Sequence, residues 1–164
     1  MEQALSFDDI LLVPQYSDIS TRKEVDTSVS MRALRKLQLP IVSSPMDTIT
    51  GENMACAISA AGGIGVLHRY NTIEEQCTMV MNITSKGHDV GAAIGVGGDF
   101  LERATALAQV GVSFLCVDVA HGHHLSVKGA LKTLKETFGD SMHIMAGNVA
   151  TLQAFHDLAD WGAD

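Results

Sequence analysis

The chain has 164 residues, which suffice for one domain with a sizeable core, whereas a complete eight-unit α/β barrel needs about 250 residues. Hydrophobic residues make up 46% and charged residues 18% of the sequence, a composition that excludes extensive disorder because apolar burial can offset chain entropy. The formal net charge of -8 argues against nucleic-acid partners, since a phosphate backbone would repel the protein. No stretch approaches the roughly 18 consecutive apolar residues of a membrane span.

The three cysteines, Cys56, Cys77 and Cys116, are an odd number without Cys-x-x-Cys spacing, and each lies in an apolar stretch. No signal-peptide pattern precedes them. We therefore expect reduced thiols in the core of a cytoplasmic protein.

Short apolar runs alternate with longer segments of helical periodicity, a pattern typical of β/α units around a parallel sheet. The apolar run at residues 5–13, bounded by Pro14, is expected to form a short strand outside or beneath this sheet. Thr72 and Glu75 have the spacing of a capping box at a helix start. In chain order we then expect strands at 40–43, 64–67, 92–96, 114–119 and 144–146, and helices at 52–61, 72–84, 100–110, 125–138 and 151–161.

This order predicts a parallel (β/α)8 TIM barrel, of which the chain supplies roughly the first five β/α units. Residues 1–164 would be the N-terminal portion of a single domain. Five strands leave an open sheet edge with unpaired backbone groups. One alternative is therefore a non-catalytic half-barrel that associates through this edge.

Parallel barrels carry their chemistry where strands end, so the loops after each apolar run are candidate sites. Ser43, Ser44 and Asp47 place two hydroxyls and a carboxylate at the end of the first predicted strand, although Ser44 and Asp47 could instead cap the following helix. The glycines at 62–65 precede a strand, which does not fit the dinucleotide fingerprint. Those at 95–98 fit either a flexible turn or a phosphate cradle.

The loop that follows the predicted strand at 114–119 is the richest in polar groups. Asp118 could accept hydrogen bonds from ribose hydroxyls, and the histidines at 121, 123 and 124 could contact a base or a phosphate. The same histidines could hold a metal that activates water, or could lie on a solvated loop. In the next such loop, Gly147 permits close approach of a ligand, and Asn148 can bind a ligand or cap a helix.

The sequence resembles the IMP dehydrogenase and GMP reductase enzymes over essentially its whole length. The resemblance rests on residues 5–14 and 22–27 and on loop segments in family order, at 43–48, 62–68, 118–123 and 146–151. Pro45 and the Gly-Gly-Ile-Gly at 62–65 are similar to dehydrogenases. The regulatory CBS modules that many dehydrogenases insert after the second helix are absent, as in reductases. The resemblance favours IMP dehydrogenase, with GMP reductase as the alternative.

The resemblance implies a homotetrameric oxidoreductase of guanine nucleotide biosynthesis that oxidises IMP to XMP with NAD, whereas a reductase would convert GMP to IMP with NADPH. In the family, a cysteine attacks C2 of the purine, hydride passes to NAD and water releases the product. The implied contacts are Ser44, Met46 and Asn148 for the purine nucleotide monophosphate, and Asp118, Ala120 and His123 for the dinucleotide.

The family's nucleophile lies in a Gly-Pro-Gly-Ser-x-Cys loop that would follow Asp164, and the potassium site is expected in the same later part. We therefore assign no catalytic residue and no metal ligand within this chain. The expectation is that the chain by itself does not turn over IMP.

Overall fold

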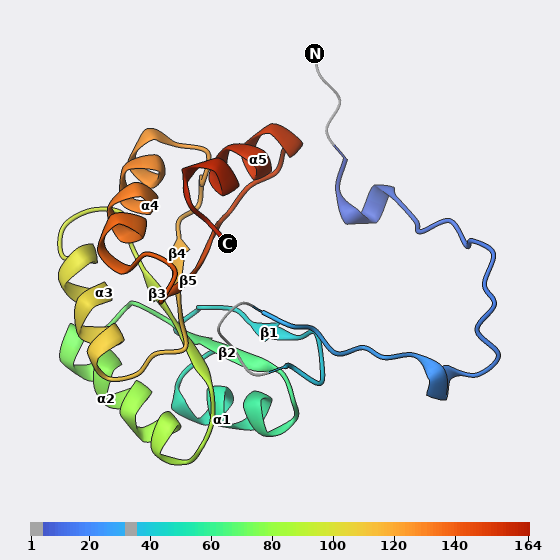
Figure 1. Ribbon diagram of the computed structural model, residues 1–164, viewed down its shortest axis with the longest axis horizontal. Coiled ribbons are helices and arrows are strands. Elements are labelled where there is room, and N and C mark those ends of the chain that lie inside the picture. The colour runs from blue at the N-terminus through green and yellow to red at the C-terminus, as the bar shows by residue number, and fades with distance from the viewer. Residues whose placement is uncertain (1–4, 32–35) are drawn as a thin grey trace.

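A parallel sheet and its connecting helices form the body of the molecule (Figure 1). The computed structural model describes residues 5–31 and 36–164. Two 3-10 helices, η1 (Phe7–Asp9) and η2 (Arg22–Glu24), precede the body. The body comprises β1 (Val42–Ser43), α1 (Glu52–Ala60), β2 (Ile64–Leu67), α2 (Ile73–Ser85), β3 (Val90–Ile94), α3 (Phe100–Gln109), β4 (Phe114–Asp118), α4 (Leu125–Phe138), β5 (His143–Gly147) and α5 (Leu152–Trp161).

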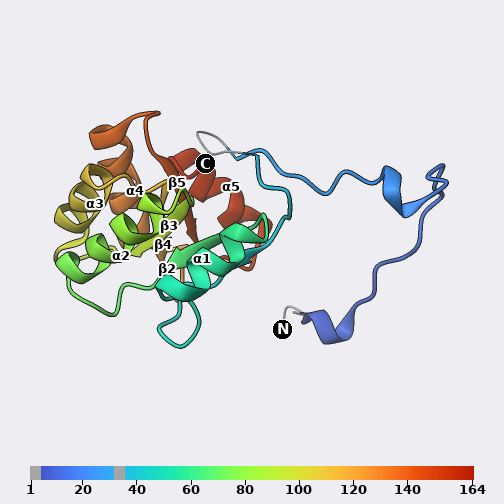
Figure 2. The same cartoon turned by 90° about the horizontal axis from the view of Figure 1, so that it is seen from below.

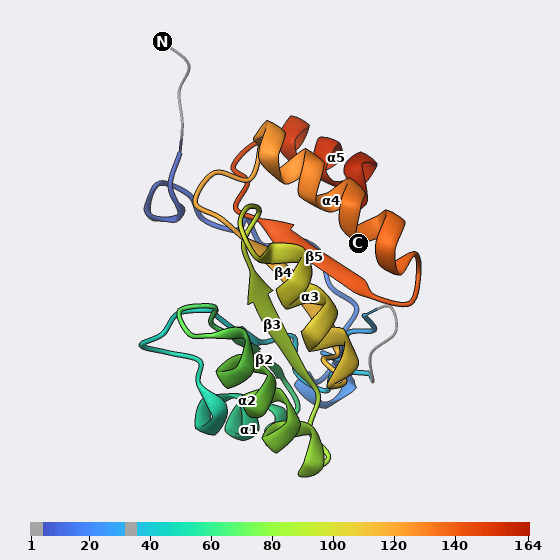
Figure 3. The ribbon, with the colours of Figure 1, turned by 90° about the vertical axis from the view of Figure 1, so that its left-hand side faces the viewer.

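The strands pair in chain order, β1-β2-β3-β4-β5, and every pair is parallel. A helix follows each strand, and the helices gather on one face of the curled sheet (Figures 2 and 3). This architecture is a half-barrel, and it confirms the predicted β/α units of a partial TIM barrel.

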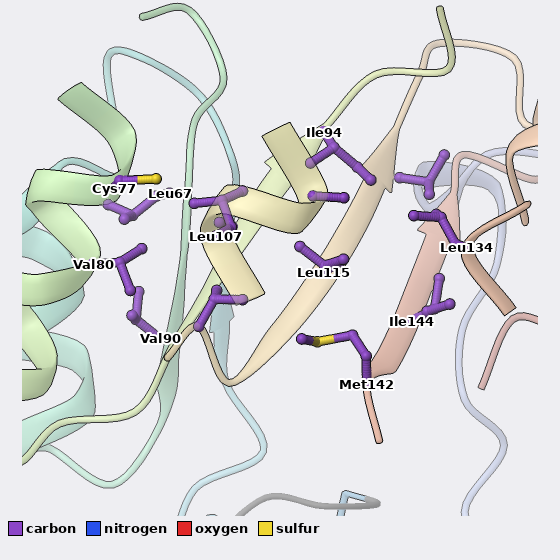
Figure 4. Packing of buried hydrophobic residues seen from close by; sticks show 14 of the residues in the cluster. Leu67, Cys77, Val80, Val90, Ile94, Leu107, Leu115, Leu134, Met142 and Ile144 are labelled. Atoms are coloured by element: carbon purple, nitrogen blue, oxygen red, sulfur yellow. The ribbon is translucent and has the colours of Figure 1, made fainter. Parts of the chain in front are cut away.

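Alternate residues of each strand point to opposite faces of the sheet. Leu67, Ile94, Leu115 and Ile144 pack in a fully buried cluster between the sheet and the helices (Figure 4). The other face carries a smaller cluster that would line the barrel interior, made of Leu37, Ile64, Val66, Ala93, Phe114 and Cys116.

The segment that leads into β1 closes the amino end of this interior. Leu37 is buried in the interior cluster and pairs with Val29 in an antiparallel bridge. Gln38 lies against Gly62, just before β2, where an added Cβ would approach the Gln38 Cβ to 2.9 Å. In parallel α/β barrels the ligand-binding residues lie at the opposite, carboxyl end of the strands.

The strand predicted at residues 5–13 is wrong. Ser6 and Asp9 close a short 3-10 turn, with the Ser6 backbone N–H 2.8 Å from the Asp9 carboxylate, and no strand follows. Leu11 and Leu12 are 94% and 98% exposed, and the segment runs away from the body (Figure 1). An apolar run forms a strand only beside a partner edge, and β1 pairs only with β2 in the described residues.

Strand limits also differ from the expected ones. The third strand is two residues earlier than predicted, at 90–94, because Val90 is fully buried and leads the pairing with β2, while Gly91 leads the pairing with β4. β1 lacks residues 40 and 41, which is consistent with the missing N–H of Pro40. β5 begins at His143, which pairs with Phe114 of β4.

A buried polar network joins the carboxyl ends of β2 and β3. The Gln76 side chain on α2 donates to the carbonyl oxygens of His68 (3.0 Å) and Ala93 (2.9 Å). The Arg103 guanidinium on α3 donates to Gln76 Oε1 at 2.9 Å and to Asp99 at 3.0 Å. Because Gln76 is fully buried, these bonds satisfy groups that water cannot reach, and they hold the carboxyl ends of β2 and β3 together.

We expect Gly91→Ala to lower the free energy of unfolding by about 1–3 kcal/mol. A Cβ at this position in β3 would overlap the ring of Phe114 inside the packed interior. Gly129→Ala in α4 is the matched control, because an added Cβ would meet nothing within 4 Å outside the adjacent backbone of its own helix and alanine favours the helix by roughly 0.5–1 kcal/mol. Urea denaturation measures both, and equal midpoints for the two variants would contradict this account of the interior.

Candidate functional site

The loops after β4 and β5 are joined by backbone hydrogen bonds. The Val119 N–H donates to Gly147 O at 3.1 Å, and the Asn148 N–H donates back to Val119 O at 2.8 Å. The Gly122 N–H donates to Asn148 O at 2.7 Å. A Cβ on Gly122 would itself lie 2.7 Å from that oxygen, so only glycine permits this approach.

A cavity of about 220 Å³ lies between these two loops and the start of α5. It brings together three residues that the sequence predicts for ligand binding: Ala120, His123 and Asn148. The remaining lining residues are His121, Val149, Ala150, Thr151 and Ala154. Polar groups among small side chains leave both room and hydrogen-bonding capacity for a ligand.

Asn148 does not cap the helix that follows it, so that alternative is wrong. The N-cap of α5 is Thr151, whose hydroxyl accepts the Ala154 N–H at 3.1 Å. The Asn148 side-chain amide instead donates from Nδ2 to Val119 O at 3.1 Å, and its side-chain Oδ1 has no partner among the described residues. This oxygen is free to accept a hydrogen bond at the cavity.

Asp118 is the last residue of β4 and pairs with Gly147 in the sheet. It is half-buried, and no described residue forms a hydrogen bond or ion pair with its carboxylate. A carboxylate at a strand end with unfilled acceptor positions suits a ligand that carries hydroxyl donors. Its predicted contact with a ribose stays a prediction.

Ser44 and Met46 lie in the loop after β1, at the same carboxyl edge but outside the cavity. Both are exposed, and buried Thr50 fixes the loop by donating to Ser44 O at 2.6 Å. The N-cap of α1 is Gly51, so capping by Ser44 or Asp47 is wrong. The structure thus brings all six predicted residues to one edge but gathers only three around one cavity.

The histidines after β4 take separate roles. His124 is the N-cap of α4, where its Nδ1 accepts the Ser126 N–H at 3.2 Å. His123 turns to α5, where its Nε2 lies 2.7 Å from Asp157 Oδ2. Within residues 5–31 and 36–164, no three His, Cys, Asp or Glu side chains converge as metal ligands, so the metal-site alternative gains no support.

Three further side chains at this edge of the sheet are not among the predicted site residues, although Arg69 belongs to a basic pair that follows the second predicted strand. Arg69, at the end of β2, lies against Gly95, with a guanidinium nitrogen 3.6 Å from the position of a Cβ there. On α5, Asp157 and Trp161 both contact His123. The four-residue spacing of these two side chains on one helix face was the available signal, but the spacing does not reveal which loop they face.

None of the three cysteines lies at the carboxyl edge. Cys56 and Cys77 are in α1 and α2, and Cys116 is inside β4, as predicted, and all three are free. Burial, together with the smaller effect of the neighbouring Asp118 carboxylate, raises the pKa of the Cys116 thiol to about 12. Burial also raises the pKa of Cys77, against the opposing effect of Arg103. Thiolates at these two positions are therefore scarce at neutral pH.

We expect a thiol reagent such as Ellman's reagent to label Cys56 first in the native protein at pH 8, because Cys56 is only half-buried. Cys77 and Cys116 should react only as the protein unfolds, since the raised pKa values keep them protonated. Cys56→Ser should remove the fast phase. Rapid labelling of Cys116 in the folded protein would contradict its assignment as an inert core thiol.

No helix in the described part of the chain combines the length and apolarity that crossing a membrane requires.

Comparison with known proteins identifies similar sequences along the whole chain. The family model described as "IMP dehydrogenase / GMP reductase domain" matches residues 4–164. An inosine-5'-monophosphate dehydrogenase of Nitrosopumilus maritimus is 25% identical over 287 residues, covering 99% of this chain and 60% of that protein. A GMP reductase of Mycoplasma mycoides subsp. mycoides is 31% identical over 160 residues, covering 96% and 49%. An inosine-5'-monophosphate dehydrogenase of Cryptosporidium parvum is 32% identical over 205 residues, covering 99% and 50%.

The chain thus spans about half the length of these curated relatives. The alignments with the two dehydrogenases run over 287 and 205 residues, more than the 164 residues of this chain. Those two relatives therefore carry additional residues inside the aligned region. The alignment with the reductase, over 160 residues, needs no such insertion.

Proposed function

This chain belongs to the IMP dehydrogenase / GMP reductase family, and we propose from that premise that the protein oxidises IMP to XMP with NAD. The balanced reaction is IMP + NAD⁺ + H₂O → XMP + NADH + H⁺. Relatives with both names match the chain, so the family membership supports a purine nucleotide oxidoreductase, and the direction of the reaction is our proposal.

The observation that carries the proposal is the group of residues at the carboxyl ends of β4 and β5. Asp118 has a carboxylate without a partner among the described residues, one residue before the loop that lines the cavity. A ribose offers two vicinal hydroxyl donors, which a carboxylate can accept together. We assign Asp118, Ala120 and His123 to the dinucleotide, whose nicotinamide accepts the hydride when it is bound.

We assign the purine nucleotide to Ser44, Met46 and Asn148. The exposed Ser44 hydroxyl can bind a polar group of the nucleotide, and Met46, which is 48% exposed, offers apolar surface to a purine ring. The free side-chain Oδ1 of Asn148 can orient the reacting end. We assign the nucleophile to no residue of this chain, because all three cysteines lie in helices or inside a strand. We assign the potassium site to no residue of this chain either.

The dehydrogenase direction rests on the loop after β1, where Pro45 follows two serines, and on Gly-Gly-Ile-Gly at residues 62–65. One observation favours GMP reductase, with NADPH as reductant: the reductase alignment needs no insertion. Two assays of the full-length protein distinguish the dehydrogenase from the reductase. With IMP and NAD, a dehydrogenase increases the absorbance of the reduced cofactor; with GMP and NADPH, a reductase decreases it. Turnover only in the second mixture would contradict our choice.

We expect Asp118→Asn to weaken NAD binding about 10- to 100-fold, because the neutral amide loses charge-assisted hydrogen bonds to the ribose. IMP binding should change less than twofold, since Asp118 is not assigned to the purine nucleotide. Isothermal titration of each ligand measures both constants in the full-length protein. Asp160→Asn, an exposed acid on α5, is the matched control, and equal NAD affinity in the two variants would contradict the assignment.

A second candidate function, the half-barrel that associates, has its own supporting observation. A cavity of about 270 Å³ with a mainly apolar lining runs between β5 and α5, and Phe155 beside it is 61% exposed. We expect residues 1–164, expressed alone, to self-associate and to form no NADH from IMP and NAD. Light scattering gives the mass. A stable monomer whose β5 amides are fully protected from hydrogen exchange would contradict this second candidate.

A further inference from the structure

His123 is held by a side-chain network on α5. Its Nε2 lies 2.7 Å from Asp157 Oδ2, and the Gln153 amide donates to the other carboxylate oxygen at 2.8 Å. These hydrogen bonds, that from His123 being the strongest, hold the pKa of Asp157 below its ordinary range. Asp157 is therefore ionised at neutral pH, and each of its oxygens has a donor.

The His123 ring also stacks on Trp161, one turn further along α5. The two ring centroids are 5.6 Å apart and the planes are inclined by 28°. The Lys128 ammonium lies 5.4 Å from the Trp161 ring centroid. Residues 153, 157 and 161 recur at four-residue intervals, so their side chains lie on one face of α5. This face packs against the loop after β4, where His123 contacts Asp157 and Trp161.

This arrangement determines which ring nitrogen of His123 is left for a ligand. An ionised carboxylate only accepts hydrogen bonds, so Nε2 must carry a proton. In the neutral ring Nδ1 then carries a free lone pair. This lone pair is directed away from the Asp157 carboxylate, because the two nitrogens lie on different sides of the imidazole ring. His123 lines the 220 Å³ cavity, and no described residue forms a hydrogen bond with Nδ1.

We propose that Asp157 is a positioning residue, which holds His123 in the Nε2–H tautomer and so presents Nδ1 as a hydrogen-bond acceptor for a hydroxyl group of the dinucleotide. The identity of the ligand rests on the proposed function, whereas the tautomer does not. Asp157 acts only through His123 and is not a catalytic residue. Gln153 supports it by occupying the second carboxylate oxygen.

Nitrogen-15 NMR of full-length protein, at a pH where histidine is neutral, reads the tautomer directly. We expect His123 to be protonated at Nε2 in the wild type and to populate both tautomers in Asp157→Ala. Asp160→Ala removes an acid from the same helix without touching His123 and should leave the spectrum unchanged. A wild-type ring protonated at Nδ1, or an unchanged ring in Asp157→Ala, overturns the proposal.

The second measurement is the affinity for NAD. Asp157→Ala should weaken NAD binding about three- to tenfold and leave IMP binding unchanged, because one hydrogen bond is misaligned. In a His123→Ala background the same substitution should have no further effect, since Asp157 acts through the ring. An undiminished effect there overturns the positioning role.

These two measurements separate the positioning role from the proposed function. If wild-type protein binds no NAD while the tautomer still depends on Asp157, the proposed function fails and the positioning of His123 stands. The fluorescence of Trp161, the one tryptophan in the sequence, serves as an independent reporter. The emission spectrum should change in Asp157→Ala, because the His123 ring stacked on Trp161 loses its hydrogen bond to Asp157. An identical spectrum would count against the proposal.

Discussion

The parallel pairing of five strands in chain order is the constraint on which the rest of the structure depends. Parallel strands place all their carboxyl ends at one edge of the sheet, so residues far apart in sequence become neighbours there. The amino end is closed by Leu37 and Gln38. Every candidate ligand-binding residue consequently lies at the opposite edge.

At that edge, backbone contact between the loops after β4 and β5 shapes the 220 Å³ cavity. Gly122 lets the loop after β4 approach Asn148 to hydrogen-bonding distance, and the exchange between Val119 and Asn148 extends the sheet pairing beyond the strands. The buried Gln76 and Arg103 play the corresponding role for β2 and β3. The loops after β4 and β5, which carry candidate binding residues, are thus tied to the rigid sheet, and under the proposed function this lowers the entropy lost when a ligand binds.

The helix α5 supplies the side chains that orient His123. The resemblance implies a dinucleotide contact for His123, but it assigns no partner that orients the ring. Asp157 and Trp161 supply that orientation from the helix after β5. Under the proposed function, a dinucleotide that meets a fixed imidazole loses no entropy to ordering the ring, although Asp157 itself lines no part of the cavity.

The sequence by itself determined the alternation of strands and helices, the capping box of Thr72 and Glu75, and the clustering of polar residues after strands. These depend on local periodicity and on neighbours within a few residues. Residues 5–13 have strand-like character, but only the tertiary structure shows that no sheet edge pairs with them. The tertiary structure also decided that Asn148 faces a cavity rather than capping α5, and that His123 pairs with Asp157. That pair joins residues 34 positions apart, and the direction of each side chain depends on how the loop after β4 packs on α5.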